Sequence, residues 1–372
     1  MKLQKTIQAK IIGLTNTKRE KLESEYSNFQ DILQLQNLEF LPIYKKLKLY
    51  SATKQQAERL AKRTNPKKEQ PLIIRKDLIK VVKTDNKLSE YWVRIPVYKK
   101  SIWVAVNFSH KQQNLLNYEL SESKLIKGKK DWFLNVTVQK EQKLKTNYAD
   151  VLSIDLGVKN IASVVQYFNK KTKFYGKTIR KTRGYYFYLR KKLARKKIRG
   201  FYKKIKNSKE KRITKDQLHK IAKDIVDWAK KTNSAIVIGD LKGIRKSAKG
   251  KGKRFNRKLN SAPVYQLSRF VEYKANWEGI SVMKINEAFT SQIHWKCGNK
   301  GIRKSQGLFW CPECKEEENA DRNGSINICK RGLGYMSKLG VVLAQPRTEA
   351  MFIKKSAARL CGSECDLRIS RF

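Results

Sequence analysis

The sequence predicts an α+β protein made of two folded domains and a C-terminal tail. Its 372 residues are 40% hydrophobic, which is enough apolar surface for more than one core. Segments with the alternation of β-strands are interspersed with segments of helical periodicity. Near residue 148 the strands change from alternating patterns to continuous apolar runs, as in a fully buried sheet. We therefore expect domains at 1–148 and 149–331, and a loosely ordered basic tail at 332–372.

The first domain is predicted to be a small β-barrel that contains a helical insertion. A strand candidate at 6–14 precedes apolar residues at helical spacing from about 17 to 65. Pro66 and Pro71 then break the helical pattern. Alternating, strand-like segments follow at 91–98, 101–108 and 132–139.

The second domain is predicted to have the element order β-β-β-α-β-α-β. Three strand candidates come first, at 151–157, 160–168 and 173–180. A helical region follows, and after it a strand at 235–238, a helix at 264–277 and a strand at 280–285. The first strand, VLSIDLG, ends in Asp155. Three strands joined by tight polar turns, the first ending in an aspartate, are typical of an RNase H-like sheet.

The charge balance of the chain indicates nucleic acid as a partner. Lys and Arg number 84 against 32 Asp and Glu, which gives a formal net charge of +52. Self-repulsion on this scale needs a polyanion to offset it, which argues against a small-metabolite enzyme. No apolar run approaches the ~18 residues of a membrane span, and the start MKLQKTIQAK lacks the apolar core of a signal peptide. We expect a soluble, cytoplasmic, nucleoid-associated protein with no membrane partner.

Two basic stretches, 190–215 and 242–258, are the predicted nucleic-acid-binding segments. The first contains Glu210 as its one acid, and the second contains none. Most charge runs are solvated surface, but aromatic residues lie among and beside these cations, as stacking on bases requires. The candidate binding residues are Arg190, Lys191, Arg195, Lys196, Lys203, Lys204, Arg245, Lys251, Lys253, Arg254 and Arg257.

Four residues late in the chain have the spacing of a tetrahedral zinc ribbon, which we place at about 290–318. His294 and Cys297 form one pair, and after thirteen residues Cys311 and Cys314 form another. A closed Cys₃His set leaves no open position for water, so the expected role of Zn²⁺ is structural. The alternative is that only the three cysteines matter and that His294 is a surface residue.

Two aspartates are notable because acidic residues at the ends of strands or the starts of helices call for a functional or structural explanation in so basic a chain. Asp155 ends the first central strand, and Asp321 begins a predicted helix in NADRNGSIN. Taken singly, each is explained as a turn or cap residue. Taken with the strand order, they suggest a site where three or four carboxylates hold a pair of divalent ions, for which Mg²⁺ is suited.

Four motifs of the chain resemble those of a known nuclease family. IDLG, the strand IVIGDL, the cysteine-pair ribbon and NADRNGSIN occur in the order of the RuvC-like nuclease of the TnpB family. These are transposon-encoded, RNA-guided DNA endonucleases related to type V CRISPR effectors. The resemblance implies that Asp155 and Asp321 are the first and third of three carboxylates that bind two Mg²⁺ ions. It also implies a guide RNA and target double-stranded DNA as partners, with a wedge-like N-terminal domain that recognises a short transposon-adjacent DNA motif and the base of the guide.

One position departs from this resemblance. The family has Glu-Asp-Leu at the end of the second central strand, whereas this chain has Gly239-Asp240-Leu241. Asp240 is expected to point to the opposite face of an extended strand. We predict that Glu287, in KINEAFTS at the end of the next strand, supplies the missing carboxylate, because neighbouring strands lie only ~4.8 Å apart.

The predicted catalytic and magnesium-binding set is therefore Asp155, Glu287 and Asp321. The alternative is a nuclease-dead, RNA-guided DNA-binding repressor, which explains Gly239 directly. A plain structural RNA-binding protein would explain the charge but not the ordered acids.

Overall fold

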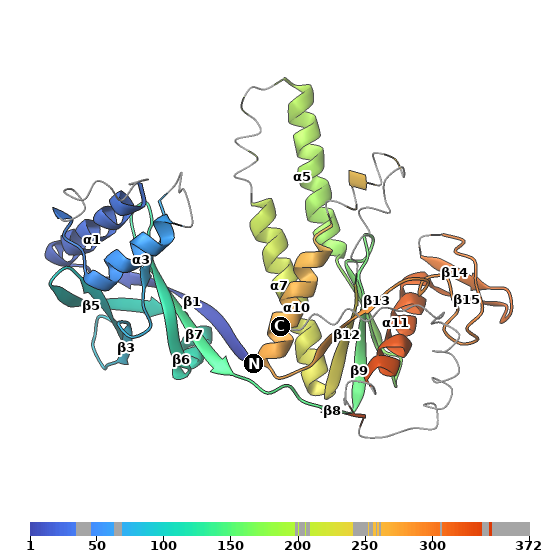
Figure 1. Ribbon diagram of the computed structural model, residues 1–372. Helices are drawn as coiled ribbons and strands as arrows, with labels where there is room; N and C mark the ends of the chain where they lie inside the picture. The colour runs from blue at the N-terminus through green and yellow to red at the C-terminus, as the bar shows by residue number, and fades with distance from the viewer. Residues whose placement is uncertain are drawn as a thin grey trace. The chain divides into compact units, whose positions relative to one another are not determined.

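A computed structural model describes residues 1–34, 46–62, 69–197, 200, 205, 209–240, 252, 256–257, 259, 262–305, 307–336 and 342–343 (Figure 1). The chain forms two compact units, Met1–Gln142 and Lys143–Phe372, each described here by itself. Both units combine helices and strands, so the predicted α+β class is confirmed.

The first unit is built on a curled, antiparallel seven-stranded sheet with the order β2-β6-β7-β1-β5-β4-β3 (Figure 1). The strands are β1 (Lys2–Ile12), β2 (Leu72–Ile74), β3 (Lys80–Lys83), β4 (Tyr91–Val97), β5 (Lys100–Phe108), β6 (Glu119–Lys127) and β7 (Trp132–Glu141). The three strands predicted from alternation are present as β4, β5 and β7, and alternate residues of β7 are buried. Closure of this sheet into a barrel stays a prediction.

The helical insertion of the first unit contains α1 (Asn16–Gln34) and α3 (Ser51–Ala61) among the described residues. Glu25 of α1 is 2% exposed and holds the insertion together. Its Oε1 accepts a hydrogen bond from the backbone N–H of Tyr50, just before α3, and its Oε2 accepts one from the N–H of Tyr98. Two short helical turns, α4 (His110–Gln113) and η1 (Asn114–Asn117), join β5 to β6.

The second unit has a five-stranded sheet with the order β11-β10-β9-β12-β13. Its strands are β9 (Asp150–Asp155), β10 (Ala162–Gln166), β11 (Thr172–Tyr175), β12 (Ser234–Asp240) and β13 (Val282–Asn286). Strands β9, β12 and β13 are parallel, and β10 runs antiparallel to both its neighbours. The predicted element order is confirmed in the described residues, where α5 (Lys177–Arg195) and α7 (Glu210–Lys231) lie between β11 and β12.

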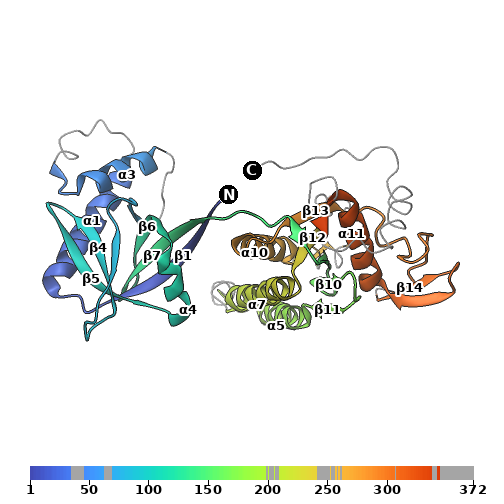
Figure 2. The same ribbon diagram turned by 90° about the horizontal axis from the view of Figure 1, so that it is seen from below.

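Helices cover both faces of this sheet. Figure 2 shows α7 (Glu210–Lys231) and α10 (Val264–Trp277) on one face and α11 (Ala320–Met336) on the other. The continuous apolar residues of β9 and β12 are buried from both sides, as their composition predicts. Helix α5 (Lys177–Arg195) pairs with α7 and extends beyond the sheet in Figure 1.

The predicted strand at 173–180 is wrong in its second half. Strand β11 ends at Tyr175, and α5 begins at Lys177. Between them Gly176 has a φ of 110°, in the left-handed region, so it turns the chain sharply. A Cβ at this position would also lie 2.6 Å from the backbone nitrogen of Ile161.

Residues 332–336, which we expected in the tail, are helical instead. Helix α11 continues to Met336, because Leu333 and Met336 are buried in the core of the second unit. Val342–Leu343 form a further strand, β16, which pairs in parallel with β8 (Asn147–Tyr148). The rest of 337–372 lies outside the described residues.

Gly332 lets α11 pack close against β12. A Cβ built at this residue would lie 2.7 Å from both Cγ atoms of Val237. We expect Gly332→Ala to lower the free energy of unfolding by about 1–3 kcal/mol, because overpacking forces the helix and strand apart. In α5, a Cβ at Gly184 would meet no atom of the described chain within 4 Å, so Gly184→Ala should instead stabilise by about 0.5–1 kcal/mol. Urea unfolding measures both, and a stabilised Gly332→Ala variant would contradict the packing.

Candidate active site and metal centre

The predicted catalytic carboxylates of Asp155, Glu287 and Asp321 come together at one edge of the five-stranded sheet. Asp155 is the last residue of β9, and Glu287 directly follows β13. Asp240, which was not in the predicted set, is the last residue of β12 between them. These strands are parallel, so their carboxyl ends meet at the same edge. Asp321, in the first turn of α11, approaches from the covering helix.

The buried carboxylates repel one another. Burial and, to a smaller extent, the charge of Asp321 raise the pKa of Asp155 to about 7. The positive charge of Arg303 opposes this rise. Burial raises the pKa of Glu287 to about 8, with further contributions from the charges of Asp155 and Asp240. Asp240, expected on the opposite face, therefore still acts on the site. The Oε1 atom of Glu287 is buried and has no hydrogen-bond partner in the described chain.

Glu287 fills the space beside Gly239. Gly239 lies on β12 and is paired with Ile285 of the parallel strand β13, and Glu287 directly follows that strand. A Cβ built on Gly239 would lie 1.7 Å from Oε1 of Glu287 and 2.3 Å from its carboxyl carbon. The Glu287 carboxylate therefore lies where a side chain on residue 239 would begin, and any larger residue at 239 would displace it.

Asp321 is held by two side chains that the sequence did not single out. Asn160 donates from Nδ2 to Oδ2 of Asp321 at 2.8 Å, and Arg303 donates from Nη2 to Oδ1 at 3.3 Å. Nothing in the sequence distinguishes Arg303 from the many other cations. Asn160 lies in the turn after IDLG, which is the one signal that could have marked it.

The NADRNGSIN motif attaches α11 to the neighbouring loop. The side chain of Asn323 accepts a hydrogen bond from the N–H of Trp295 and donates one to the carbonyl of Ile293. Asn327 donates to the carbonyls of Thr290 and Ile293. These amides therefore cross-link the helix to the 290–295 loop. A Cβ at Gly324 would lie 3.0 Å from Oδ2 of Asp155, so this glycine allows the helix to approach the site.

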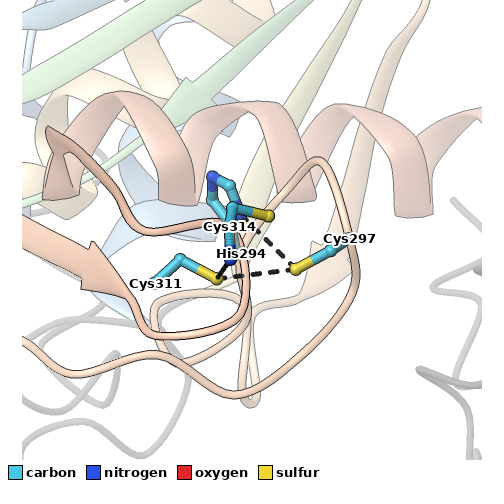
Figure 3. A group of neighbouring side chains, drawn as sticks. All are labelled: His294, Cys297, Cys311 and Cys314. Carbon is cyan, nitrogen blue, oxygen red and sulfur yellow. Dashed lines mark hydrogen bonds between the residues drawn. The ribbon is translucent and has the colours of Figure 1, made fainter.

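The four predicted ribbon residues converge on one point (Figure 3). One ligand atom from each of His294, Cys297, Cys311 and Cys314 lies within 4.8 Å of the other three. Nδ1 of His294 lies 3.5 Å from Sγ of Cys297. His294 is 1% exposed, so the alternative of a surface histidine is wrong. The cluster could hold a metal ion.

The cluster lies on a hairpin with a small core. Strands β14 (Leu308–Cys311) and β15 (Glu316–Asn319) form the hairpin that carries Cys311 and Cys314. Nε2 of His294 is buried without a hydrogen bond in the described chain, and Oε2 of Glu318 lies 3.9 Å away. Apart from the ligands, the described core here is little more than Phe309 and Ala320, which is too small to hold the hairpin alone.

Five of the predicted nucleic-acid-binding residues lie in the described part of the chain. Arg190, Lys191 and Arg195 are on α5, and Lys196 caps its C-terminus. The guanidinium of Arg257 lies 3.7 Å from the ring centroid of Phe187. The remaining candidates lie outside the described residues: Lys203, Lys204, Arg245, Lys251, Lys253 and Arg254. In the described chain, none of the helices has the length and apolar character needed to cross a membrane.

Comparisons with known proteins identify the family of this chain. A family profile described as "Cas12f1-like, TNB domain" matches residues 265–328, which include Glu287, Asp321 and the His/Cys cluster. A TnpB-like protein of Methanocaldococcus jannaschii is 32% identical over 201 residues, which cover 50% of this chain and 70% of that protein. The chain belongs to the TnpB family.

Some of the other relatives of this TnpB-family chain are CRISPR-associated proteins. The endodeoxyribonuclease Cas12f2 of a Micrarchaeota archaeon is 31% identical over 225 residues, 55% of this chain, but the chain spans only 41% of that protein. A cryo-EM structure of a Cas12f1–sgRNA–target DNA complex contains a similar fold, with a TM-score of 0.60 and 13% identity. This match covers 88% of this chain and 99% of the Cas12f1 chain.

Proposed function

We propose that this TnpB-family chain is an RNA-guided DNA endonuclease that cuts in a RuvC-like site formed by Asp155, Glu287 and Asp321. One relative is named an endodeoxyribonuclease, and the similar Cas12f1 fold is bound to sgRNA and target DNA. In this proposal residues 149–331 form the nuclease domain with its ribbon at about 290–318. Residues 1–148 form the wedge-like barrel that recognises a transposon-adjacent DNA motif.

The observation that carries the proposal is the position of the Glu287 carboxylate. It lies in the space of a side chain at residue 239, the position at which the resemblance to the family implies a glutamate. The glycine that removes the usual carboxylate also makes room for the new one. A repressor that had lost cleavage would have no reason to bury a carboxylate beside Asp155 at a cost in stability. The arrangement therefore favours the nuclease over the repressor.

The donor set fits hard divalent cations. Glu287 brings a buried, unpartnered oxygen to a site where its negative charge is near those of Asp155 and Asp240. Mg²⁺, as two ions held by Asp155, Glu287 and Asp321, would supply Lewis-acid activation of water and of the leaving oxygen. Asn160 and Arg303 orient the Asp321 carboxylate, and the charge of Arg303 reduces repulsion within the cluster.

The His/Cys cluster fits a structural Zn²⁺. Three sulfurs and one imidazole nitrogen form a closed tetrahedral set. Its hairpin ends at Asn319, whose side chain caps α11 by accepting hydrogen bonds from the N–H groups of Asp321 and Arg322. The ribbon thereby positions Asp321. The cations of α5, with Arg257, are the proposed contacts to the nucleic-acid backbone.

The test is cleavage of guide-matched double-stranded DNA by the purified protein–RNA complex, with and without Mg²⁺. We expect Asp155→Ala to reduce cleavage at least about 100-fold while guide-RNA binding is retained, because the variant loses one metal-binding carboxylate. Asp216→Asn, which removes an exposed carboxylate on α7, is the matched control and should cleave normally. Tight guide-dependent DNA binding without cleavage by the wild type would establish the repressor instead.

A further inference from the structure

A cavity of about 310 Å³ lies beside the proposed active site, between the loop after β9 and the first half of α5. Its volume is at the lower end of the range of ligand pockets, about 300–1,000 Å³. Its walls come from the 157–161 loop, Gly176 and α5, the start of α7 at Glu210, and Arg257, Ala262 and Pro263. All of these residues are described, and none is a proposed metal ligand.

The cavity gathers more positive charge than its described walls neutralise. Five cations line it, namely Lys159, Arg180, Arg183, Arg190 and Arg257, against the single described carboxylate of Glu210. Glu210 pairs with Arg190 at 2.6 Å. In the described chain, no ion pair joins the other four cations to an acid. Convergent cations in a partly enclosed space favour an anionic ligand.

Arg183 is one of the two half-buried cations of this set. Its Nε atom is buried and has no hydrogen-bond partner in the described chain. Burial is the main factor that lowers its pKa; the charge of Arg190 lowers it further, and the charge of Glu210 opposes this. A buried guanidinium nitrogen without an acceptor is costly, and an oxygen of a phosphate group would satisfy it.

The part of the cavity wall one turn along α5 from Arg183 is suited to a flat, apolar group. The Arg257 guanidinium is stacked on the ring of Phe187, with 3.7 Å between its carbon and the ring centroid. Ile161 and Ile179 also line the cavity, and they are buried, at 5% and 3% exposure. A planar ring with apolar surroundings next to a cluster of arginines matches a nucleotide, which joins a base to a phosphate.

The cavity and the carboxylate site share one loop. Lys159 and Ile161 line the cavity, and Asn160 between them donates its hydrogen bond to Asp321. Lys159 also reaches the ribbon, because a Cβ at Gly307 would lie 2.9 Å from its Nζ atom. A group in the cavity would therefore contact the same turn that orients a proposed catalytic carboxylate.

We propose that this cavity binds one unstacked nucleotide of the DNA strand that enters the active site, with its phosphate at Arg183 and its base against Phe187. The bound nucleotide fixes the position of the strand relative to the carboxylates. This inference rests on the proposed function for the identity of the strand. A free mononucleotide has the same chemistry, so the experiment separates the two sources.

The experiment is photo-crosslinking of single-stranded DNA that contains 5-iododeoxyuridine to the purified wild-type protein in Mg²⁺-free buffer without a chelator, which prevents cleavage and leaves the zinc site intact. Mass spectrometry of the peptides identifies the crosslinked residue. We expect the crosslink at Phe187 rather than at Tyr188, its neighbour on α5, which is 64% exposed. Arg183→Gln should lower the yield at Phe187 about tenfold or more, whereas Lys181→Gln, an equal charge change at an exposed residue of the same helix, should not. Thermal melting checks that both variants fold.

Crosslinks at Tyr185 or Tyr188 without one at Phe187, or equal yields in the two variants, would overturn the proposal. Crosslinking of free 5-iododeoxyuridine monophosphate at the same concentrations as the oligonucleotide would also overturn it, since the site would then serve free nucleotides. Because this assay needs no cleavage, it can succeed or fail independently of the nuclease assignment.

The same inference predicts a position-specific effect in the guide-loaded complex. Removing a single base near the cut should slow wild-type cleavage about tenfold at one position, because a base–aromatic stack is lost. The Phe187→Ala variant should cut the intact and the abasic DNA at equal rates. Cleavage by the wild type with no sensitive position would contradict the cavity proposal alone.

Discussion

Glu287→Gln is expected to abolish Mg²⁺-dependent DNA cleavage and, at the same time, to stabilise the protein in the absence of Mg²⁺. The glutamine keeps the shape of the side chain but removes one of the carboxylate charges that hold the metal ions. Metal stabilisation of the reacting oxygens is worth several kcal/mol, so the rate should fall at least about 100-fold. The measurement is cleavage by the guide-loaded complex, together with thermal unfolding in Mg²⁺-free buffer without a chelator, which keeps the zinc site intact.

The gain in stability should depend on pH. The folded-state pKa of Glu287 is about 8, above its ordinary value of 4.5, so the folded protein favours the protonated form. The stabilising protonation is fully present below about pH 4.5 and is lost as the pH rises through about 8. The melting temperature of Glu287→Gln should therefore exceed that of the wild type increasingly between pH 5 and about 8, by about 2–4 °C for each kcal/mol. An equal difference in melting temperature at the two ends of this pH range would contradict a buried Glu287 carboxylate with a raised pKa.

The space shared by Glu287 and Gly239 supplies the control for this prediction. Gly239→Glu alone should also lose activity, because its Cβ would collide with the Glu287 carboxylate. Gly239→Glu combined with Glu287→Ala moves the carboxylate to the position that the family uses, and should restore cleavage. The double variant could instead fold and bind guide RNA but stay inactive. Glu287 would then have a role other than replacing a carboxylate at residue 239.

Local patterns were enough to predict most elements of the second unit. The continuous apolar runs of β9 and β12 could only be central strands, and the paired spacing of His294, Cys297, Cys311 and Cys314 required one metal-binding point. The end of α11 was missed because RGLGYM contains two glycines, which weaken a helical pattern. The structure shows that Gly332 is a packing requirement against Val237, which no local pattern encodes.

Contacts between segments that are distant in the chain could not be predicted from the sequence. Strand β1 pairs with both β5 and β7, and alternation within each strand does not specify such partners. The site shows the same limit. Glu287 could be proposed from its place after a strand, but its position in the space of residue 239 depends on the register of β12 and β13. The bonds from Asn160 and Arg303 to Asp321 join the ends of loops that only the fold brings together.

Cys311→Ser is expected to remove bound zinc from the protein and to unfold the hairpin that precedes Asp321. Structural zinc sites contribute about 10–16 kcal/mol of apparent binding free energy in small peptides, far more than the few buried residues around Phe309 supply. Metal analysis of the wild type should give one zinc per chain, and the variant should give almost none. Because the hairpin ends at the Asn319 cap of α11, cleavage should fall with the loss of zinc.

Cys329→Ala is the matched control for this prediction. Cys329 is also buried and lies on α11, but it is not part of the His/Cys cluster. Its replacement should cost stability through packing while the zinc content stays at one per chain. His294→Ala separates the four-ligand set from a three-cysteine set, since it should lower zinc affinity as Cys311→Ser does. Full zinc content in Cys311→Ser would refute the ribbon. If only His294→Ala kept its full zinc content, the three cysteine sulfurs would be the zinc ligands. Asp321 would then depend on Asn160 and Arg303 for its position.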